Sequence, residues 1–313
     1  MNQKTELKQG EQSTIFPSSP YQPQKPETIS SLTSYKILFW NVEKKDLSEE
    51  IGEIANHHKA DFILIGELIS KDTKKYKAEL EKSGYKLRTT STAKVKIFDR
   101  FSSSPQKTVS IPKDDVHYSQ RNRITSMIYN INGHKVLLVG IHLFSKASMK
   151  RESSRLNFGG LTLDVIKYIE DQHKIDKTII IGDFNINPFE SGMIDFFGMN
   201  ATMSKNIALH RERIISKQKK RFLFNPSWEV YSKVGELNKP VGTYYFEDTY
   251  DTLVPYWNLL DQVLISPNLV HNSLSFEIVS SAGDKVPTLL NEKFLPDAEQ
   301  YSDHLPILYK IQF

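Results

Sequence analysis

Six short apolar runs, far apart in the sequence, each end in a carboxylate, an imidazole or a carboxamide. The runs with their polar ends are Phe39-Trp40-Asn41, Ile65-Gly66-Glu67, Gly140-Ile141-His142, Gly182-Asp183-Phe184-Asn185, Leu260-Asp261-Gln262 and Ser302-Asp303-His304. Continuous apolar runs are typical of strands that are buried on both faces, and active sites of layered α/β proteins collect where such strands end. We therefore expect the six polar ends to converge on one cleft.

The composition permits a large folded domain and excludes several kinds of chemistry. Hydrophobic residues make up 39% of the 313 residues, which is ample for a buried core. The absence of cysteine excludes disulfides, cysteine zinc sites and thiol catalysis, and it favours a reducing, cytoplasmic location. No apolar run is long enough to cross a bilayer, so we expect no membrane span. The net charge of +4 permits a nucleic-acid partner without arguing for one.

The first 34 residues differ in composition from the rest of the chain. They are rich in Gln, Ser, Thr and Pro, and such a segment cannot bury enough apolar surface to offset its ordering entropy. We expect residues 1–34 to be a flexible tail; the alternative is a partner-docking arm around Ile15, Phe16 and Tyr21. With no repeats and no second shift in composition, residues 35–313 are expected to form one catalytic domain.

The start of this domain predicts a strand–helix–strand unit. Residues 36–40 and 62–65 are apolar runs typical of strands. Between them, Asp46 is the expected N-cap of a helix, and Glu49 would complete a capping box. This spacing is typical of a βαβ unit.

Later segments predict further strands and one long helix. Asn132-Gly133, between the apolar runs 124–129 and 136–141, is a strong hairpin signal. Residues 153–171 have helical periodicity, and the short apolar runs at 178–181, 263–265 and 305–309 are typical of strands.

The polar strand ends offer the groups that a phosphoryl-transfer site requires. Glu67 and Asn41 can hold magnesium, which takes a few oxygen ligands and keeps several waters. Asp183 and Asn185 lie two residues apart and should share one face of an extended chain. Taken singly, Asn41 could instead cap a turn, Glu67 could form a surface ion pair, and the Asp183 segment could be a strand-to-turn junction.

Two histidines complete the set. An imidazole held by a carboxylate is fixed in tautomer and charge, so His304 with Asp303 or Asp261 suits metal binding or catalysis. His142 directly follows an apolar strand. The alternatives are a surface Asp-His pair at the C-terminus and a buried, hydrogen-bonded imidazole at residue 142.

In this order, the six motifs resemble those of the endonuclease/exonuclease/phosphatase superfamily, which includes deoxyribonuclease I-like and exonuclease III-like enzymes. The resemblance extends from Tyr35 to the final Asp303-His304 pair. It implies an α/β (α+β) fold, a four-layer sandwich of two face-to-face mixed β-sheets flanked by helices.

The resemblance also implies an activity, a cofactor and a role for each residue. Mg²⁺, with Mn²⁺ as a substitute, would be held by Glu67, Asn41 and Asp303. The implied catalytic residues are His142, Asp183, Asn185, Asp261 and His304. The implied activity is metal-dependent hydrolysis of DNA or RNA phosphodiesters by an endonuclease or exonuclease. Open alternatives are a phosphatase or phospholipid phosphodiesterase, acting on inositol phosphates or sphingomyelin, and a catalytically silent binding protein.

Two departures from the family pattern bear on these alternatives. Gly66 stands where the family often has glutamine, which leaves metal binding by Glu67 intact. The segment Trp257-Asn258-Leu259-Leu260-Asp261-Gln262 replaces the Trp-Cys-Asp-Arg motif of 5-phosphatases, which counts against that subgroup.

Clusters of basic residues are candidate substrate contacts. The segment from residue 211 to 221 has six basic residues and precedes Phe222, Phe224 and Trp228, a combination that suits a nucleic-acid backbone. The alternative is a solvated helix face or loop. The candidate substrate-binding residues are Arg121, Arg123, Lys146, Arg211, Arg213, Lys219, Lys220 and Arg221.

Overall fold

The computed structural model describes residues 32–90, 93–101, 107–108, 123–146, 148, 151–233, 235–248 and 254–313. The predicted tail lies outside the described residues except for its last three, and Ser34 already begins the first strand. Arg121 also lies outside them. No helix in the described ranges is long and apolar enough to cross a membrane.

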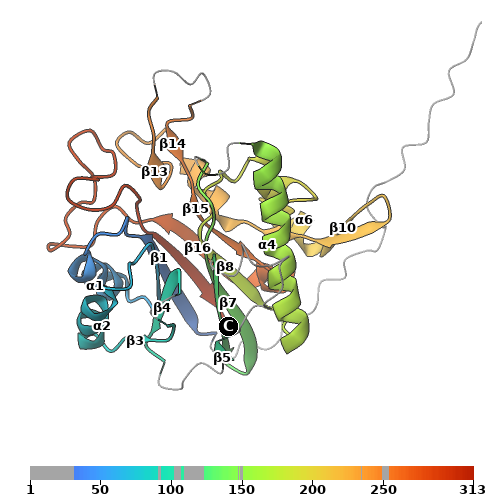
Figure 1. Cartoon of the computed structure of the whole chain (residues 1–313), viewed down its shortest axis with the longest axis horizontal. Coiled ribbons are helices and arrows are strands. Elements are labelled where there is room, and N and C mark those ends of the chain that lie inside the picture. Colours follow the sequence, from blue (N-terminus) through green and yellow to red (C-terminus); the bar gives the residue numbers. More distant parts are fainter. Residues whose placement is uncertain are drawn as a thin grey trace, which may run out of the picture.

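Two β-sheets pack face to face in the centre of the molecule (Figure 1). One has the strand order β16-β17-β1-β2-β4-β3, and the other has the order β5-β6-β7-β8-β15-β12-β9. The strands of the first sheet are β1 (Ser34–Asn41), β2 (Phe62–Gly66), β3 (Lys86–Leu87), β4 (Val95–Asp99), β16 (Ser273–Ile278) and β17 (Ile307–Gln312). Those of the second are β5 (Lys107–Thr108), β6 (Ile124–Ile131), β7 (His134–His142), β8 (Thr178–Asp183), β9 (Ala201–Thr202), β12 (Leu223–Phe224) and β15 (Asp261–Ile265).

Helices cover the outer faces of both sheets, so the fold has four layers. The helices α1 (Ser48–His58) and α2 (Thr73–Lys82) pack on the first sheet, and α4 (Glu152–His173) packs on the second (Figure 1). Smaller elements are α5 (Ser191–Ile194), α6 (Lys205–Leu209), the 3₁₀ segments Pro226–Lys233 and Pro267–Asn272, and two small hairpins. These hairpins are β10 (Glu212–Ile215) with β11 (Gln218–Arg221), and β13 (Tyr244–Tyr245) with β14 (Trp257–Asn258). The predicted α/β sandwich is confirmed.

The core explains why the strands are apolar throughout. Along β1, Ile37 and Phe39 face the second sheet, while Leu38 and Trp40 face the helices α1 and α2. Strands covered on both faces need apolar residues at every position, as the sequence pattern predicted.

The predicted βαβ unit is present, but its helix begins differently from the prediction. The strands β1 and β2 pair in parallel, with Asn41 opposite Gly66. Asp46 is not the N-cap: the helix begins at Ser48 after Leu47, without a side-chain cap. The Asp46 carboxylate instead accepts a hydrogen bond from the Ser48 hydroxyl at 2.9 Å and pairs with Lys75. The predicted capping box is therefore wrong.

The hairpin and the long helix agree with their predictions. Asn132 and Gly133 both have positive φ, at 49° and 81°, and join β6 to β7 in an antiparallel pair. Two consecutive residues with positive φ form a two-residue hairpin turn whose twist matches that of the flanking strands. The helix α4 contains the predicted residues 153–171. It ends at His173, and the C-cap residue Lys174 has the left-handed conformation.

Strand pairing brings the polar ends to one edge of the sandwich. In the second sheet, Asp183 lies opposite both His142, on the parallel strand β7, and Asp261, on the antiparallel strand β15. In the first sheet, β1 and β2 end side by side at Asn41 and Gly66. These ends form the site described below.

Candidate active site

A cleft of about 860 Å³ opens at this edge of the sandwich. Seven of the eight predicted catalytic and metal-binding residues line it, and the eighth, Asp261, lies completely buried against His304. The seven are Asn41, Glu67, His142, Asp183, Asn185, Asp303 and His304. The structure therefore brings together side chains from six separate segments.

Asp183 is the most constrained carboxylate in the cleft. It accepts hydrogen bonds from the Asn185 backbone N–H at 2.8 Å, the Asn185 Nδ2 at 3.0 Å and the Asn41 Nδ2 at 3.1 Å. Gly182 makes this turn possible, because a Cβ there would lie 2.0 Å from the Ile141 carbonyl oxygen. Burial raises the pKa of Asp183 above the ordinary aspartate range. A carboxyl with this shift can exchange protons closer to neutral pH.

Glu67 and His142 form a second pair next to Asp183. The His142 Nε2 lies 3.2 Å from the Glu67 carboxylate and 3.7 Å from that of Asp183. The hydrogen bond from His142 lowers the pKa of Glu67 to about 2, against the opposing effect of burial. Glu67 has a φ of 55°, in the left-handed region, where the chain turns out of the strand β2. The lowered pKa favours the ionised form of Glu67, whose carboxylate faces the cleft.

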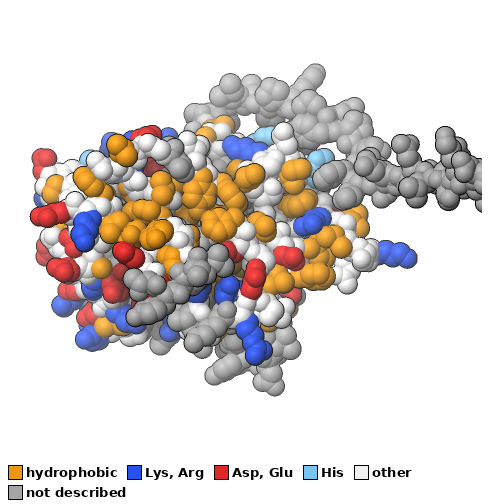
Figure 2. Space-filling view, turned by 90° about the horizontal axis from the view of Figure 1, so that it is seen from above, with side chains coloured by type: hydrophobic (Ala, Val, Ile, Leu, Met, Phe, Trp, Pro, Cys, Tyr) orange, Lys and Arg blue, Asp and Glu red, His pale blue; other side chains and the backbone are white. Residues whose placement is uncertain are grey.

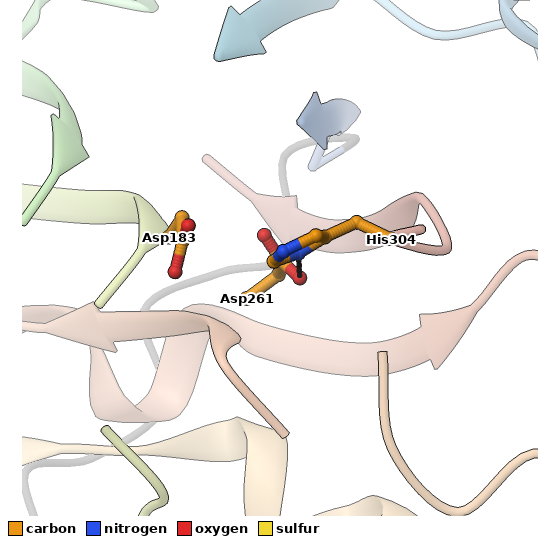
Figure 3. A group of neighbouring side chains, drawn as sticks. All are labelled: Asp183, Asp261 and His304. Carbon is orange, nitrogen blue, oxygen red and sulfur yellow. Dashed lines mark hydrogen bonds and ion pairs between the residues drawn. The ribbon is translucent and has the colours of Figure 1, made fainter. Parts of the chain in front are cut away.

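Asp261 and His304 form a buried carboxylate–imidazole pair (Figure 3). The His304 Nδ1 lies 2.7 Å from the Asp261 Oδ2. Burial by itself lowers the pKa of His304, but Asp261 and Asp183 outweigh burial and raise it well above its ordinary value. Asp261 thus favours the protonated form of the His304 imidazole.

Backbone contacts hold both members of this pair. The Thr243 hydroxyl accepts hydrogen bonds from the Leu260 and Asp261 backbone N–H groups at 3.2 and 3.1 Å. On the other side, the Trp40 indole donates to the His304 carbonyl oxygen at 2.8 Å. These contacts fix the imidazole relative to the end of β1.

Carboxylates crowd the first-sheet side of the cleft, as at a cation site. The Glu43 carboxylate accepts from the Asp303 backbone N–H at 3.2 Å. Burial raises the pKa of Asp303, and the neighbouring Glu43 and Glu67 raise it further against the opposing effect of His304. Asp183, Asp261 and His304 also lie within 4.8 Å of one another. His304 is engaged by Asp261, so the carboxylate and carboxamide oxygens are the better donors for a hard cation such as Mg²⁺.

Two of the predicted substrate-binding cations lie near the cleft. The Arg123 guanidinium lies 3.9 Å over the Phe144 ring, and burial lowers its pKa while Glu67 and Asp183 raise it. Lys146 lines the cleft, and its Nζ pairs with Glu190 at 2.6 Å.

The predicted basic segment lies at the opposite end of the second sheet. It forms the hairpin β10–β11, which projects from the body (Figure 1). Its last residue, Arg221, donates to the Glu170 carboxylate, which also accepts from Thr178 at the start of β8. Asp183 is the last residue of β8, so it lies about 17 Å from Thr178 at the usual rise per residue of a strand. A substrate that contacts both must be extended.

The hairpin also differs chemically from its prediction. Lys220 donates to the Gly198 carbonyl oxygen at 2.7 Å, and Lys219 pairs with Glu212 at 2.8 Å. The expected aromatic neighbours Phe222 and Phe224 are core residues, with 7% and 5% of their surface exposed. They cannot stack on a ligand, and that part of the prediction is wrong.

Sequence reasoning missed the residues that form the far wall of the cleft. They include Tyr244, Phe246 and Asn258, with Glu43 beside Asp303. The aromatic run Tyr244-Tyr245-Phe246, followed by Tyr256-Trp257 just before Asp261, is the sequence signal that could have identified them.

Comparison with known proteins identifies the fold. No family model and no curated protein matches the sequence. A solved endonuclease/exonuclease/phosphatase family protein from Bacteroides thetaiotaomicron is 14% identical, with a TM-score of 0.55, and the match covers 90% of this chain and 98% of that one. Truncated TDP2 from Caenorhabditis elegans is 16% identical, with a TM-score of 0.53 and coverages of 89% and 97%. A 3′ phosphatase from Neisseria, bound to a product DNA hairpin, is 14% identical, with a TM-score of 0.52 and coverages of 89% and 100%.

At these identities the likeness concerns the fold. The matches extend over nearly the whole of this chain and of the three solved proteins, and the order of layers and strands described above agrees with the predicted architecture. The protein therefore has the same fold as these solved proteins, a four-layer α/β sandwich.

Proposed function

We propose that the protein is a divalent-metal-dependent phosphodiesterase that hydrolyses nucleic acids. The observation that carries the proposal is the cleft in which Asp183, held by two carboxamides, lies beside the Asp261–His304 pair. A buried carboxylate next to a fixed cationic imidazole suits phosphoester hydrolysis, which requires an activated water and stabilisation of negative charge. Similar solved proteins include one bound to a DNA hairpin and one bound to single-stranded DNA, which supports the choice of nucleic acid.

In the proposed mechanism, Asp183 orients the attacking water and accepts its proton as the water oxygen bonds to phosphorus. The P–O bond to the leaving oxygen breaks, and that oxygen takes a proton from solvent water. The raised pKa of Asp183 suits this role, and the Asn41 and Asn185 carboxamides prevent the carboxylate from rotating. His304, whose Nδ1 is directed to Asp261, uses its other nitrogen to donate to a phosphate oxygen as charge accumulates there. His142 helps to position the phosphate from the Glu67 side.

The residues present fit a divalent cation. Glu67, Asn41 and Asp303 would hold it, because they supply two carboxylates and one carboxamide oxygen at the crowded acidic side of the cleft. A bound Mg²⁺ or Mn²⁺ would neutralise charge on the phosphate.

The test is a substrate panel with the purified full-length protein and magnesium chloride. Plasmid DNA, single-stranded DNA, RNA, inositol phosphates and sphingomyelin vesicles are compared, with EDTA as the metal-free control. We expect cleavage of nucleic acid that EDTA abolishes. Turnover of sphingomyelin or inositol phosphates with no cleavage of any polynucleotide would contradict the proposal.

A matched pair of variants separates intrinsic activity from a contaminating nuclease. His134 and His142 are the first and last residues of β7, and His142 alone of the two lines the cleft. We expect His142→Gln to lose at least about 100-fold in rate, a typical effect of removing one catalytic side chain, and His134→Gln to retain activity. Equal activity of the two variants would show that the cleavage comes from elsewhere.

A further inference from the structure

Part of the lining of the cleft is aromatic. Tyr244 and Phe246 line the same cleft as Asp183 and His304. The Tyr244 ring lies 5.0 Å from the His304 ring, and these two residues also form an isolated β-bridge. We call Tyr244 and Phe246 the aromatic wall. Its first residue, Tyr244, packs against the His304 imidazole.

Phe246 is held in place but not covered. Its backbone N–H donates to the Tyr256 carbonyl oxygen at 2.8 Å, which continues the β13–β14 pairing. Even so, 44% of its surface is exposed, as is 51% of that of Tyr256. Tyr256 has a φ of 60°, so the hairpin keeps a strained residue next to the exposed ring. Because Phe246 lines the cleft together with Asp183 and His304, its exposed ring is available to a ligand bound there.

The same side of the molecule carries other hydrophobic side chains. Figure 2 looks down on the upper side of Figure 1, where the β13–β14 hairpin rises, and hydrophobic side chains gather across the middle of that face. Basic and acidic side chains surround them. Hydrophobic and charged side chains are therefore both present on this face.

We propose that Phe246 is a stacking platform for an unpaired base next to the scissile phosphate, so that the substrate is single-stranded or frayed nucleic acid. This inference rests on the proposed nucleic-acid hydrolysis and names the substrate class. Phe246 lies two residues beyond Tyr244, about 7 Å further along an extended chain. A phosphate next to His304 therefore leaves its attached base within reach of the Phe246 ring.

The chemistry of the wall selects an unpaired base. Bases within a duplex are stacked on their neighbours and present only their edges, whereas an unpaired base exposes its flat face to an aromatic side chain. Stacking accepts any base, so the wall would confer a preference for single strands without sequence specificity.

The test compares oligonucleotides with and without bases. The wild-type protein and its variants are assayed with magnesium on a single-stranded octanucleotide and on the same octanucleotide carrying tetrahydrofuran abasic residues. We expect Phe246→Ala to lower kcat/KM on the base-containing strand by about tenfold, within the range measured for one base–aromatic stack. The loss on the abasic strand should be several times smaller.

Two further variants serve as controls. Phe294 is 45% exposed, almost equal to Phe246, but does not line the cleft, so Phe294→Ala should leave both rates unchanged. Phe246→Tyr keeps a flat ring and should retain most of the wild-type rate, whereas Phe246→Leu keeps apolar bulk but should behave like Phe246→Ala.

The outcomes that overturn the inference are distinct. Equal losses on the base-containing and abasic strands would refute stacking. Loss of binding to sphingomyelin–phosphatidylserine vesicles, with oligonucleotide cleavage unaffected, would assign Phe246 to a lipid surface instead. Failure of the wild-type protein to cleave any polynucleotide would instead refute the proposed function itself, before any variant is made.

Discussion

Replacing Asp261 by asparagine tests the proposed mechanism at its most buried contact. The Asp261 side chain has one hydrogen bond among the described residues, to the His304 Nδ1 at 2.7 Å, and its Oδ1 has no partner there. Asp261→Asn changes little in volume but removes the negative charge that keeps the imidazole protonated and oriented. Any loss of catalytic rate should therefore result from the changed charge and orientation of His304.

The expected fall in kcat follows from the loss of the buried carboxylate that pairs with His304. In carboxylate–histidine catalytic pairs, the equivalent change to asparagine lowers kcat by about 10⁴, or about 5 kcal/mol in activation free energy. We expect a fall in kcat of about 10³ to 10⁴, with KM changed little, because the proposed role of His304 is in the transition state. The buried amide group, with no acceptor at the Oδ1 position, should also cost about 1–3 kcal/mol of stability.

The assay measures kcat and KM on a single-stranded oligonucleotide at a temperature well below the melting point of the variant. Circular dichroism and thermal unfolding check that Asp261→Asn is folded. Asp171→Asn is the matched control, since Asp171 is an exposed aspartate paired with Lys167 on α4. A folded Asp261→Asn variant whose kcat lies within about tenfold of wild type would refute the assigned role of the pair.

Three further predictions concern the metal, the basic hairpin and the core. Glu67→Gln should abolish metal-dependent turnover and weaken Mg²⁺ binding in titration calorimetry while the protein stays folded; wild-type turnover would place the metal elsewhere. Arg211, Arg213 and Lys217 form no ion pair within the described part of the chain. Changing all three to glutamine should reduce the slope of log binding constant against log salt concentration by about one unit per lost phosphate contact. An unchanged slope would show that the hairpin is a solvated surface. Burial lowers the pKa of Lys96 from 10.5 to about 8, which corresponds to about 3 kcal/mol at pH 7. Lys96→Met should raise the free energy of unfolding by less than this, because it also removes the hydrogen bond from Lys96 to the Ala93 carbonyl oxygen. Because the unfolded chain binds this proton more tightly, the wild type regains that stability as pH rises from about 8 to 10.5, and chemical denaturation should show the gain of Lys96→Met vanishing over that range.

The sequence by itself determined the layered fold and the residues at the polar strand ends. The continuous apolar runs required strands covered on both faces, and two of the parallel pairings, β1 with β2 and β7 with β8, place their C-terminal residues at shared edges. The turn at Asn132-Gly133 was equally local, because its backbone conformation depends on those two residue types. The capping box failed because Asp46 found partners in Ser48 and Lys75, the latter from another helix.

Only the tertiary structure decided which polar groups pair and where the remaining segments lie. Asn41 and Asp183 are 142 residues apart, and no local pattern states that one donates to the other. The same holds for His142 with Glu67. The family resemblance already implied that His304 acts with Asp261, and the structure places the two side chains 2.7 Å apart. The basic hairpin was visible as a charge run, yet its position at the far end of β8 and the burial of Phe222 follow from packing. Such contacts depend on register and packing between distant strands, whereas sequence periodicity reports only which face of its own element a residue occupies.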